Sequence, residues 1–317
     1  MENIYFWVIF NIAVLGLLIL DLFVLNKKAE PPSIKNALGW SSFWIGLALA
    51  FNIFVWWWQG QEKALEFLTG YLIEESLSVD NLFVFMLIFN YFRVPIEHQR
   101  KVLFWGIIGA LVLRAVFIIV GVTLINKFHF TIYILGFFLL VTGIRMIFNQ
   151  DKEIEPEKNP IIKLIKKFIR ITPNYVDGKF FVRINNMLHA TPLFIVVLVV
   201  ETTDIVFAAD SIPAILAVST DTFIVYTSNV FALLGLRSLY FALAGIMQLF
   251  HYLHYGLSLI LVFIGAKLML SDIYKVDMRY ALIFVAGILL LSVVISLIFP
   301  KKQEELPDNP DKDATKK

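Results

Sequence analysis

The chain has 317 residues, of which 59 % are hydrophobic and 16 % are charged, and its formal net charge is +2. Its 30 Phe and 7 Trp are far more than a soluble domain of this length carries. This composition indicates an integral membrane protein, with the lipid bilayer as its surroundings and no nucleic-acid partner. The absence of cysteine excludes disulfides, thiolate metal sites and cysteine-based redox chemistry.

Nine apolar segments are each long enough to cross a bilayer, which takes about 20 residues. They cover 6–25, 38–58, 64–90, 102–126, 131–148, 191–218, 223–249, 253–270 and 280–299. The first segment follows no basic stretch, so we expect a retained helix rather than a signal peptide. The predicted fold class is an all-α polytopic membrane protein with about nine transmembrane helices, in a transmembrane domain over residues 1–300.

The basic residues are concentrated in alternate connections. Lysines follow the first span, Arg93, Arg100 and Lys101 follow the third, and a longer basic run extends from Lys152 to Arg183. Because lysine and arginine are enriched in cytoplasmic loops, this pattern places the N-terminus outside and the C-terminus inside.

Two segments are predicted to lie outside the spans. Residues 149–190 form a cytoplasmic loop, in which 161–170 reads as a basic amphipathic helix that lies on an anionic leaflet. Residues 301–317 balance lysines against acids and have almost no apolar residues, which is typical of a disordered cytoplasmic tail.

The third and sixth spans each contain a cluster of acidic residues. The six acids are Glu74, Glu75, Asp80, Glu201, Asp204 and Asp210. A carboxylate at the centre of a bilayer costs roughly 2.5–3.5 kcal/mol on insertion scales, so intramembrane acids usually mark a functional site. We therefore predict a cation-binding site near the midplane.

The two clusters align with one another. Asp210 falls on Asp80 and Asp204 falls on Glu74, while the two spans run in opposite directions across the membrane. We therefore predict two inverted three-helix repeats, spans 3–5 and spans 6–8. In many transporters the substrate site lies where such repeats meet.

Helical geometry leaves two arrangements open for these acids. In an unbroken helix Asp80 and Asp210 point about 120° away from Glu74 and Asp204. Either each helix has a broad polar arc, or it is interrupted. Pro213 favours an interruption in the sixth span, because proline leaves the carbonyl of Ala209 without its helical partner.

The available ligands are all oxygen atoms, which suit hard cations such as Mg²⁺, Ca²⁺ and Mn²⁺. The alternative is a purely structural role, in which the acidic residues form salt bridges with buried bases such as Arg114 and Arg237. The buried acids outnumber the buried bases, however, and the excess must carry protons, bind a cation or exchange the two. The sequence contains no catalytic arrangement, so we expect no enzyme activity and no prosthetic group.

Three segments resemble hallmark motifs of the TerC family of integral membrane proteins. They are ESLSVDNLFVF (75–85), ETTDIVFAADSIPA (201–214) and TSNVFALLGLRSLY (227–240). Members of the Alx type, which this chain resembles in length and topology, are associated with manganese export from the bacterial cytoplasm. Because the family is grouped with the lysine-exporter superfamily, the resemblance implies a helical bundle with three-helix inverted repeats. Export from the bacterial cytoplasm implies a location in the bacterial plasma (inner) membrane.

The resemblance also implies a set of site residues. The metal path would consist of Glu75, Asp80, Glu201, Asp204 and Asp210. The supporting residues would be Glu74, Ser78, Asn81, Ser211, Asn229 and Arg237. We expect Mn²⁺ efflux by alternating access, with proton exchange as a coupling. The alternatives are export of a cationic amino acid and a membrane scaffold that assists metalation of secreted proteins.

Overall fold

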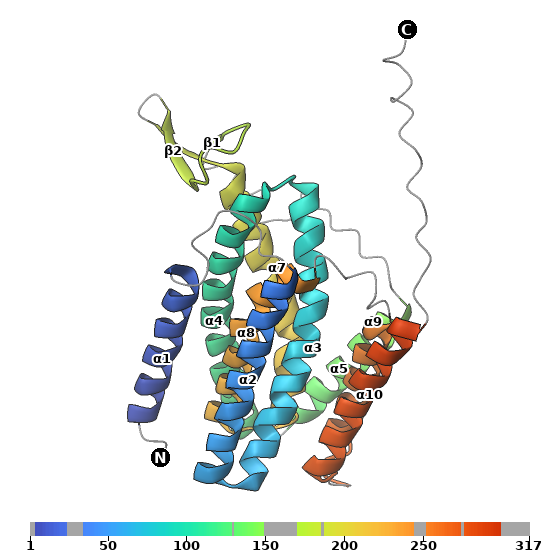
Figure 1. The fold of residues 1–317 in the computed structure, drawn as a ribbon. Coiled ribbons are helices and arrows are strands. Elements are labelled where there is room, and N and C mark those ends of the chain that lie inside the picture. The colour runs from blue at the N-terminus through green and yellow to red at the C-terminus, as the bar shows by residue number, and fades with distance from the viewer. Residues whose placement is uncertain are drawn as a thin grey trace.

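The computed structural model describes residues 4–23, 34–128, 130–148, 170–184, 187–243, 252–273 and 276–298 (Figure 1). Over these residues the chain forms helices and one small sheet. The helices are α1 (Ile4–Phe23), α2 (Ile34–Gln59), α3 (Gln61–Tyr91), α4 (Ile96–Lys127), α5 (Thr131–Phe148), α7 (Pro192–Leu216), α8 (Thr222–Leu243), α9 (Leu253–Met269) and α10 (Met278–Ile298). The strands are β1 (Arg170–Ile171), β2 (Phe181–Ile184) and β3 (Met187–Ala190).

Each predicted span corresponds to one of these helices, so the all-α polytopic membrane fold is confirmed. Six helices in the described residues are long and apolar enough to cross a membrane. Helix α3 carries charged residues along much of its length, so it can lie in a membrane only if neighbouring helices cover them. Helix α1 begins and α10 ends at opposite ends of the bundle (Figure 1).

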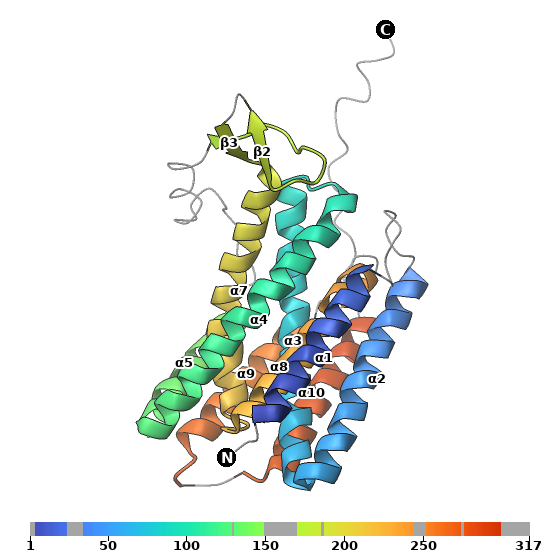
Figure 2. The same ribbon diagram turned by 90° about the vertical axis from the view of Figure 1, so that its left-hand side faces the viewer.

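Helix α8 lies in the middle of the larger group of helices. It packs against α1, α2, α3 and α4, and most of its side chains are buried. Helices α5, α9 and α10 form a second group beside it, joined to the first through α3 and α7 (Figures 1 and 2). A central helix that is buried on all sides is well placed to present polar residues away from lipid.

The helix contacts have the symmetry expected of an inverted repeat. Exchanging α3 with α7, α4 with α8 and α5 with α9 converts the α3–α8 contact into the α4–α7 contact, and both are extensive. The contacts α3–α7, α4–α8 and α5–α9 each map onto themselves and are present too. Helices α3 and α7 run in opposite directions (Figures 1 and 2), as expected for equivalent helices of an inverted repeat.

Helices α5 and α9 approach each other backbone to backbone. A Cβ added to Gly265 would lie 2.7 Å from the carbonyl oxygen of Gly136 and 2.7 Å from the amide nitrogen of Leu140. Two turns further along α5, a Cβ added to Gly143 would likewise overlap backbone atoms of Ser258 and Val262 on α9. Such close contact between small residues is a main source of attraction between helices in lipid.

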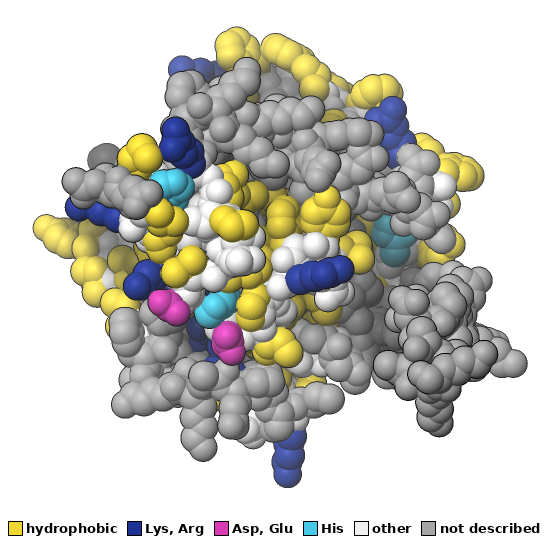
Figure 3. All heavy atoms as spheres, turned by 90° about the horizontal axis from the view of Figure 1, so that it is seen from above, with side chains coloured by type: hydrophobic (Ala, Val, Ile, Leu, Met, Phe, Trp, Pro, Cys, Tyr) yellow, Lys and Arg dark blue, Asp and Glu magenta, His cyan; other side chains and the backbone are white. Residues whose placement is uncertain are grey.

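A three-stranded sheet covers the end of the bundle where α4 and α7 begin (Figure 2). Its strand order is β1–β3–β2, with β1 parallel and β2 antiparallel to β3. Tyr175 donates a hydrogen bond to the carbonyl of Phe92 (2.8 Å), and Lys101 donates one to the carbonyl of Gly178 (2.6 Å). The sheet is therefore fixed to the turn between α3 and α4. Viewed from this end, basic, acidic and histidine side chains lie among hydrophobic ones (Figure 3).

The sequence analysis missed this sheet, because it assigned the whole of 149–190 to a loop. The strands are very short and largely exposed, so no alternation of apolar and polar residues marks them. Residues 149–169, which include most of the predicted amphipathic helix, lie outside the described residues, as does the predicted tail 301–317.

The predicted interruption at Pro213 is wrong. Helix α7 continues through Pro213 and ends one turn later at Leu216. Proline removes one helical hydrogen bond but its position, close to the end of α7, leaves only a short segment for it to disturb. The same continuity holds for α3, so each helix has a broad polar arc instead of a break.

The α5–α9 contact predicts a selective effect of adding one methyl group. Gly265→Ala should lower the melting temperature of the purified protein in detergent by several degrees, because overpacking costs about 1–3 kcal/mol. Gly287→Ala is the control, since a Cβ at that exposed position in α10 meets no atom within 4 Å. Equal melting temperatures for the two variants would contradict this account of the packing.

Candidate functional site

A buried arginine connects four helices in the middle of the bundle. Arg114 on α4 is 1 % exposed. Its Nη1 atom pairs with the carboxylate of Glu74 on α3 and donates a hydrogen bond to Asn229 Oδ1 on α8 (2.9 Å). Its Nη2 atom lies 3.5 Å from Asp204 Oδ1 on α7. We call Arg114, Glu74, Asp204 and Asn229 the Arg114 cluster.

The Arg114 cluster has an excess of negative charge. Two carboxylates face one guanidinium, and both carboxylates are buried, with side-chain exposures of 0 % for Glu74 and 5 % for Asp204. Asn229 is neutral, and its side-chain amide donates to the carbonyl of Val225 (3.0 Å). Since removing each ion from water costs several kcal/mol, an uncompensated buried carboxylate favours either protonation or the binding of a further cation.

The two repeats contribute matching faces to this region. Glu74, Ser78 and Asn81 are spaced i, i+4, i+7 along α3, and Asp204, Ala208 and Ser211 have the same spacing along α7. All six are buried, and the alignment of the two motifs places them opposite one another in pairs. Positions with this spacing share one helix face, and α3 packs against α7. The two aligned faces are therefore both buried inside the bundle, and Arg114 links them at Glu74 and Asp204.

Several oxygen atoms on these faces have no hydrogen-bond partner in the described residues. They are Glu74 Oε2, Asp204 Oδ2, Ser78 Oγ and Ser211 Oγ. Buried polar atoms are nearly always paired, so each of these is unusual. All four are acceptors, and acceptor oxygens are what a hard cation uses as ligands.

Glu201 lies at the edge of the Arg114 cluster. It is half-buried, one helical turn before Asp204 on α7, and its carboxylate rests against Gly109 of α4. A Cβ on Gly109 would overlap that carboxylate. Gly109 therefore provides the room that Glu201 occupies.

Glu75 points to a different part of the bundle. Its Oε1 atom lies 3.9 Å from the position of a Cβ on Gly235, and the Cβ of Trp44 lies 3.5 Å from the same point. Its hydrogen-bond partner is Tyr71, one turn earlier on α3. Glu75 thus faces α2 and α8, whereas its neighbour Glu74 faces α4 and α7.

The structure divides the predicted site residues into groups. It brings Asp204, Glu74 and Asn229 together around Arg114, with Glu201 one turn from Asp204 on α7, and it separates Glu75 from them. Ser78 and Ser211 are buried on the same helices as Glu74 and Asp204. The side chains of Asp80 and Asp210 lie outside the described residues. Arg237 is buried on α8, two turns beyond Asn229, and its charge acts on Arg100.

Among the described side chains, no group of three or more Asp, Glu or His residues is close enough to hold a metal ion. The reason is visible in the Arg114 cluster, where a guanidinium lies between the carboxylates that would have to converge. The sequence analysis predicted Glu74 as a supporting residue and not as part of the metal path. Its alignment with Asp204 was the signal that the two residues are equivalent.

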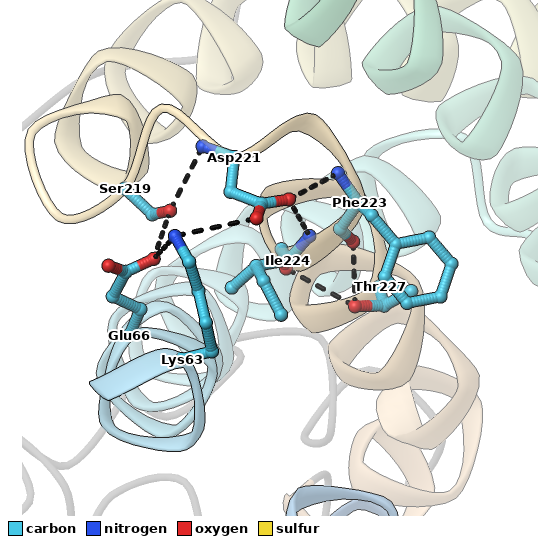
Figure 4. A network of polar contacts seen from close by, with 7 residues as sticks. All are labelled: Lys63, Glu66, Ser219, Asp221, Phe223, Ile224 and Thr227. Carbon is cyan, nitrogen blue, oxygen red and sulfur yellow. Dashed lines mark hydrogen bonds and ion pairs between the residues drawn. The ribbon is translucent and has the colours of Figure 1, made fainter. Parts of the chain in front are cut away.

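A second polar network, which the sequence analysis also missed, closes the end of the bundle opposite the sheet. Lys63 on α3 pairs with Glu66 (2.8 Å) and with Asp221 (3.4 Å), and Ser219 donates to Glu66 (2.5 Å) (Figure 4). The Asp221 carboxylate also accepts hydrogen bonds from the backbone N–H groups of Phe223 and Ile224 in the first turn of α8. This network fixes the start of α3 to the turn between α7 and α8.

Comparisons with known proteins agree with this architecture. Residues 59–304 match the model of the Integral membrane protein TerC family. An uncharacterized membrane protein of Myxococcus xanthus is 48 % identical over 310 residues, covering 98 % of this chain and 96 % of that protein. A putative membrane-bound redox modulator Alx of Salmonella typhi is 45 % identical over 299 residues, with 92 % and 93 % covered. No solved structure matches the chain significantly.

The Arg114 cluster predicts a strong effect of removing its only cation. Arg114→Gln should lower the melting temperature in detergent markedly, because breaking a buried ion pair costs about 3–5 kcal/mol. Adding Glu74→Gln should recover a large part of the loss, since the double variant leaves one fewer unpaired charge. A double variant no more stable than Arg114→Gln would show that the two side chains do not act as a pair.

Proposed function

Since the chain belongs to the TerC family of integral membrane proteins, we propose that it is a secondary transporter in the plasma (inner) membrane of a bacterium. Its substrate is Mn²⁺ or a similar divalent cation, which it exports from the cytoplasm. The observation that carries this proposal is the Arg114 cluster, where buried carboxylates exceed buried cations at the meeting point of two inverted repeats.

The chemistry of the Arg114 cluster favours a hard divalent cation. Such ions take about six oxygen ligands from carboxylates, amides, hydroxyls and water. Glu74 and Asp204 supply carboxylate oxygens and Asn229 an amide oxygen, and Ser78 and Ser211 add buried hydroxyls without partners. Asp80 and Asp210 remain predicted ligands. Soft metals that prefer thiolate find none here, because the chain has no cysteine.

The architecture suits alternating access. A site between inverted repeats can open to one side and then to the other when one repeat rocks against its counterpart. The ends of the α3–α7 interface are held differently. The sheet is attached to the α3–α4 turn at one end, and the network of Lys63, Glu66 and Asp221 joins α3 to the α7–α8 turn at the other.

The Salmonella typhi relative is named a putative membrane-bound redox modulator, and this name is compatible with metal transport. A chain without cysteine has no thiols of its own to oxidise or reduce. An effect on cellular redox state would therefore act through the ion that the protein moves, and manganese is itself redox-active.

The decisive experiment measures Mn²⁺ flux in proteoliposomes across an imposed pH gradient. Wild-type protein should move Mn²⁺, and Asp204→Asn should reduce the flux at least about tenfold, which corresponds to about 1.4 kcal/mol of lost binding. Asp80→Asn and Asp210→Asn should have similar effects. The matched control is Asp177→Asn, an exposed position on the sheet turn whose ion pair with Lys179 spans 3.9 Å.

Other outcomes separate the competing functions. Lysine efflux without Mn²⁺ flux would identify an exporter of cationic amino acids. Folded protein that moves neither substrate but retains secreted metalloproteins as partners would identify a scaffold. Wild-type flux that is independent of the pH gradient would exclude proton coupling while leaving metal export in place.

A further inference from the structure

Arg114 is not bound as a permanent structural ion pair would be. Nη1 and Nη2 each face a carboxylate, but its Nε atom is buried without a hydrogen bond, and so are Glu74 Oε2 and Asp204 Oδ2. A buried salt bridge stabilises a fold only when further hydrogen bonds satisfy the remaining donors and acceptors. The guanidinium therefore reduces the charge of the two carboxylates without saturating them, and another cation can take its place.

The guanidinium also occupies the position where a transported ion belongs. Glu74 and Asp204 are equivalent residues of the two repeats, and Arg114 lies between them. A substrate held at the interface of inverted repeats would contact these same two residues. Arg114 and the substrate therefore compete for one site.

A second partner for Arg114 lies close by. Glu201 precedes Asp204 by three residues on α7, so the two carboxylates share one face of that helix, and the Glu201 carboxylate rests against Gly109 of α4. Glu201 forms no ion pair with any side chain that the structure describes. If Arg114 moved away from Asp204, the nearest alternative carboxylate on α7 would be Glu201, one turn before Asp204.

We propose that Arg114 is a built-in counter-cation that pairs with Glu74 and Asp204 when no metal ion is bound, and moves to Glu201 when one binds. This proposal rests on the proposed function. The charges support it: two carboxylates and Arg114 sum to −1, and two carboxylates and a divalent ion sum to zero. Without Arg114 the empty site would carry −2, which is costly in a membrane.

The consequence concerns the return step of the transport cycle. After the ion leaves, the empty protein must reorient, and Arg114 keeps the empty site close to neutral while it does so. Arg114 is therefore a positioning residue for the carboxylates and is required for net transport. It is not required for exchange of one Mn²⁺ for another, because in exchange the site reorients only when occupied.

The test uses full-length wild type, Arg114→Gln and Glu201→Gln, with Asp177→Asn as the control. Three quantities are compared: Mn²⁺ affinity in detergent by calorimetry, Mn²⁺–Mn²⁺ exchange in liposomes, and net Mn²⁺ flux into manganese-free buffer. Arg114→Gln should bind Mn²⁺ more tightly, by roughly tenfold if Arg114 holds the site about nine-tenths of the time. It should retain exchange and lose at least nine-tenths of net flux.

Glu201→Gln tests the second position. It should weaken Mn²⁺ binding in the wild-type background but leave the affinity unchanged in the Arg114→Gln background, because Glu201 then has no arginine to accept. Equal weakening in both backgrounds would make Glu201 a direct ligand and overturn its role as the second partner.

Several results bear on the whole proposal. The proposal is overturned if Arg114→Gln folds but loses exchange along with net flux. It is also overturned if this variant binds Mn²⁺ more weakly than wild type. Either result leaves the proposed function in place. Should Arg114→Gln be unstable, added Mn²⁺ should restore its melting temperature, and failure to do so would count against the proposal. Wild type that neither binds nor moves Mn²⁺ overturns the proposed function and this inference together.

Discussion

The cost of burying carboxylates in a membrane is the constraint on which this structure depends. Glu74 and Asp204 lie in the bundle interior, where their mutual repulsion and their loss of hydration would both be severe. Arg114 offsets part of that cost, and it does so from a third helix while hydrogen-bonding to a fourth. The packing of α3, α4, α7 and α8 is therefore organised around one guanidinium.

The two repeats share this arrangement but are closed by different chemistry at their ends. Near the sheet, backbone carbonyls accept hydrogen bonds from Tyr175 and Lys101. At the opposite end, charged side chains hold α3 to the start of α8. These ion pairs are half-buried, with side-chain exposures of 32 % for Lys63, 12 % for Glu66 and 20 % for Asp221, so the two ends are held by contacts of different chemistry.

Departures from repeat symmetry are as informative as the symmetry itself. In the motif alignment Glu75 falls opposite Ile205, and Glu201 falls opposite Tyr71. Among the motif acids whose side chains the structure describes, these two are also the ones that lie outside the Arg114 cluster. The paired acids Glu74 and Asp204 face the shared interface, which both repeats must build, whereas the unpaired acids can serve roles that need only one repeat.

The sequence alone was sufficient to predict the helices and their approximate bounds, because apolar segments of bilayer length are a strong local signal. It also indicated the repeat, since two acidic motifs in antiparallel spans could be compared directly. It failed for the sheet, whose strands are too short to show a period. It also failed at Pro213, because a proline near a helix end disturbs few residues.

What the sequence determined by itself was the membrane fold, the pair of acidic motifs and the oxygen character of the site. Only the tertiary structure decided which acids meet. Glu74 and Glu75 are adjacent in the chain, yet one reaches Arg114 and the other faces Gly235. The physical reason is that neighbours on a helix point about 100° apart, so their partners depend on which helices pack against each face, and that is a property of the whole bundle.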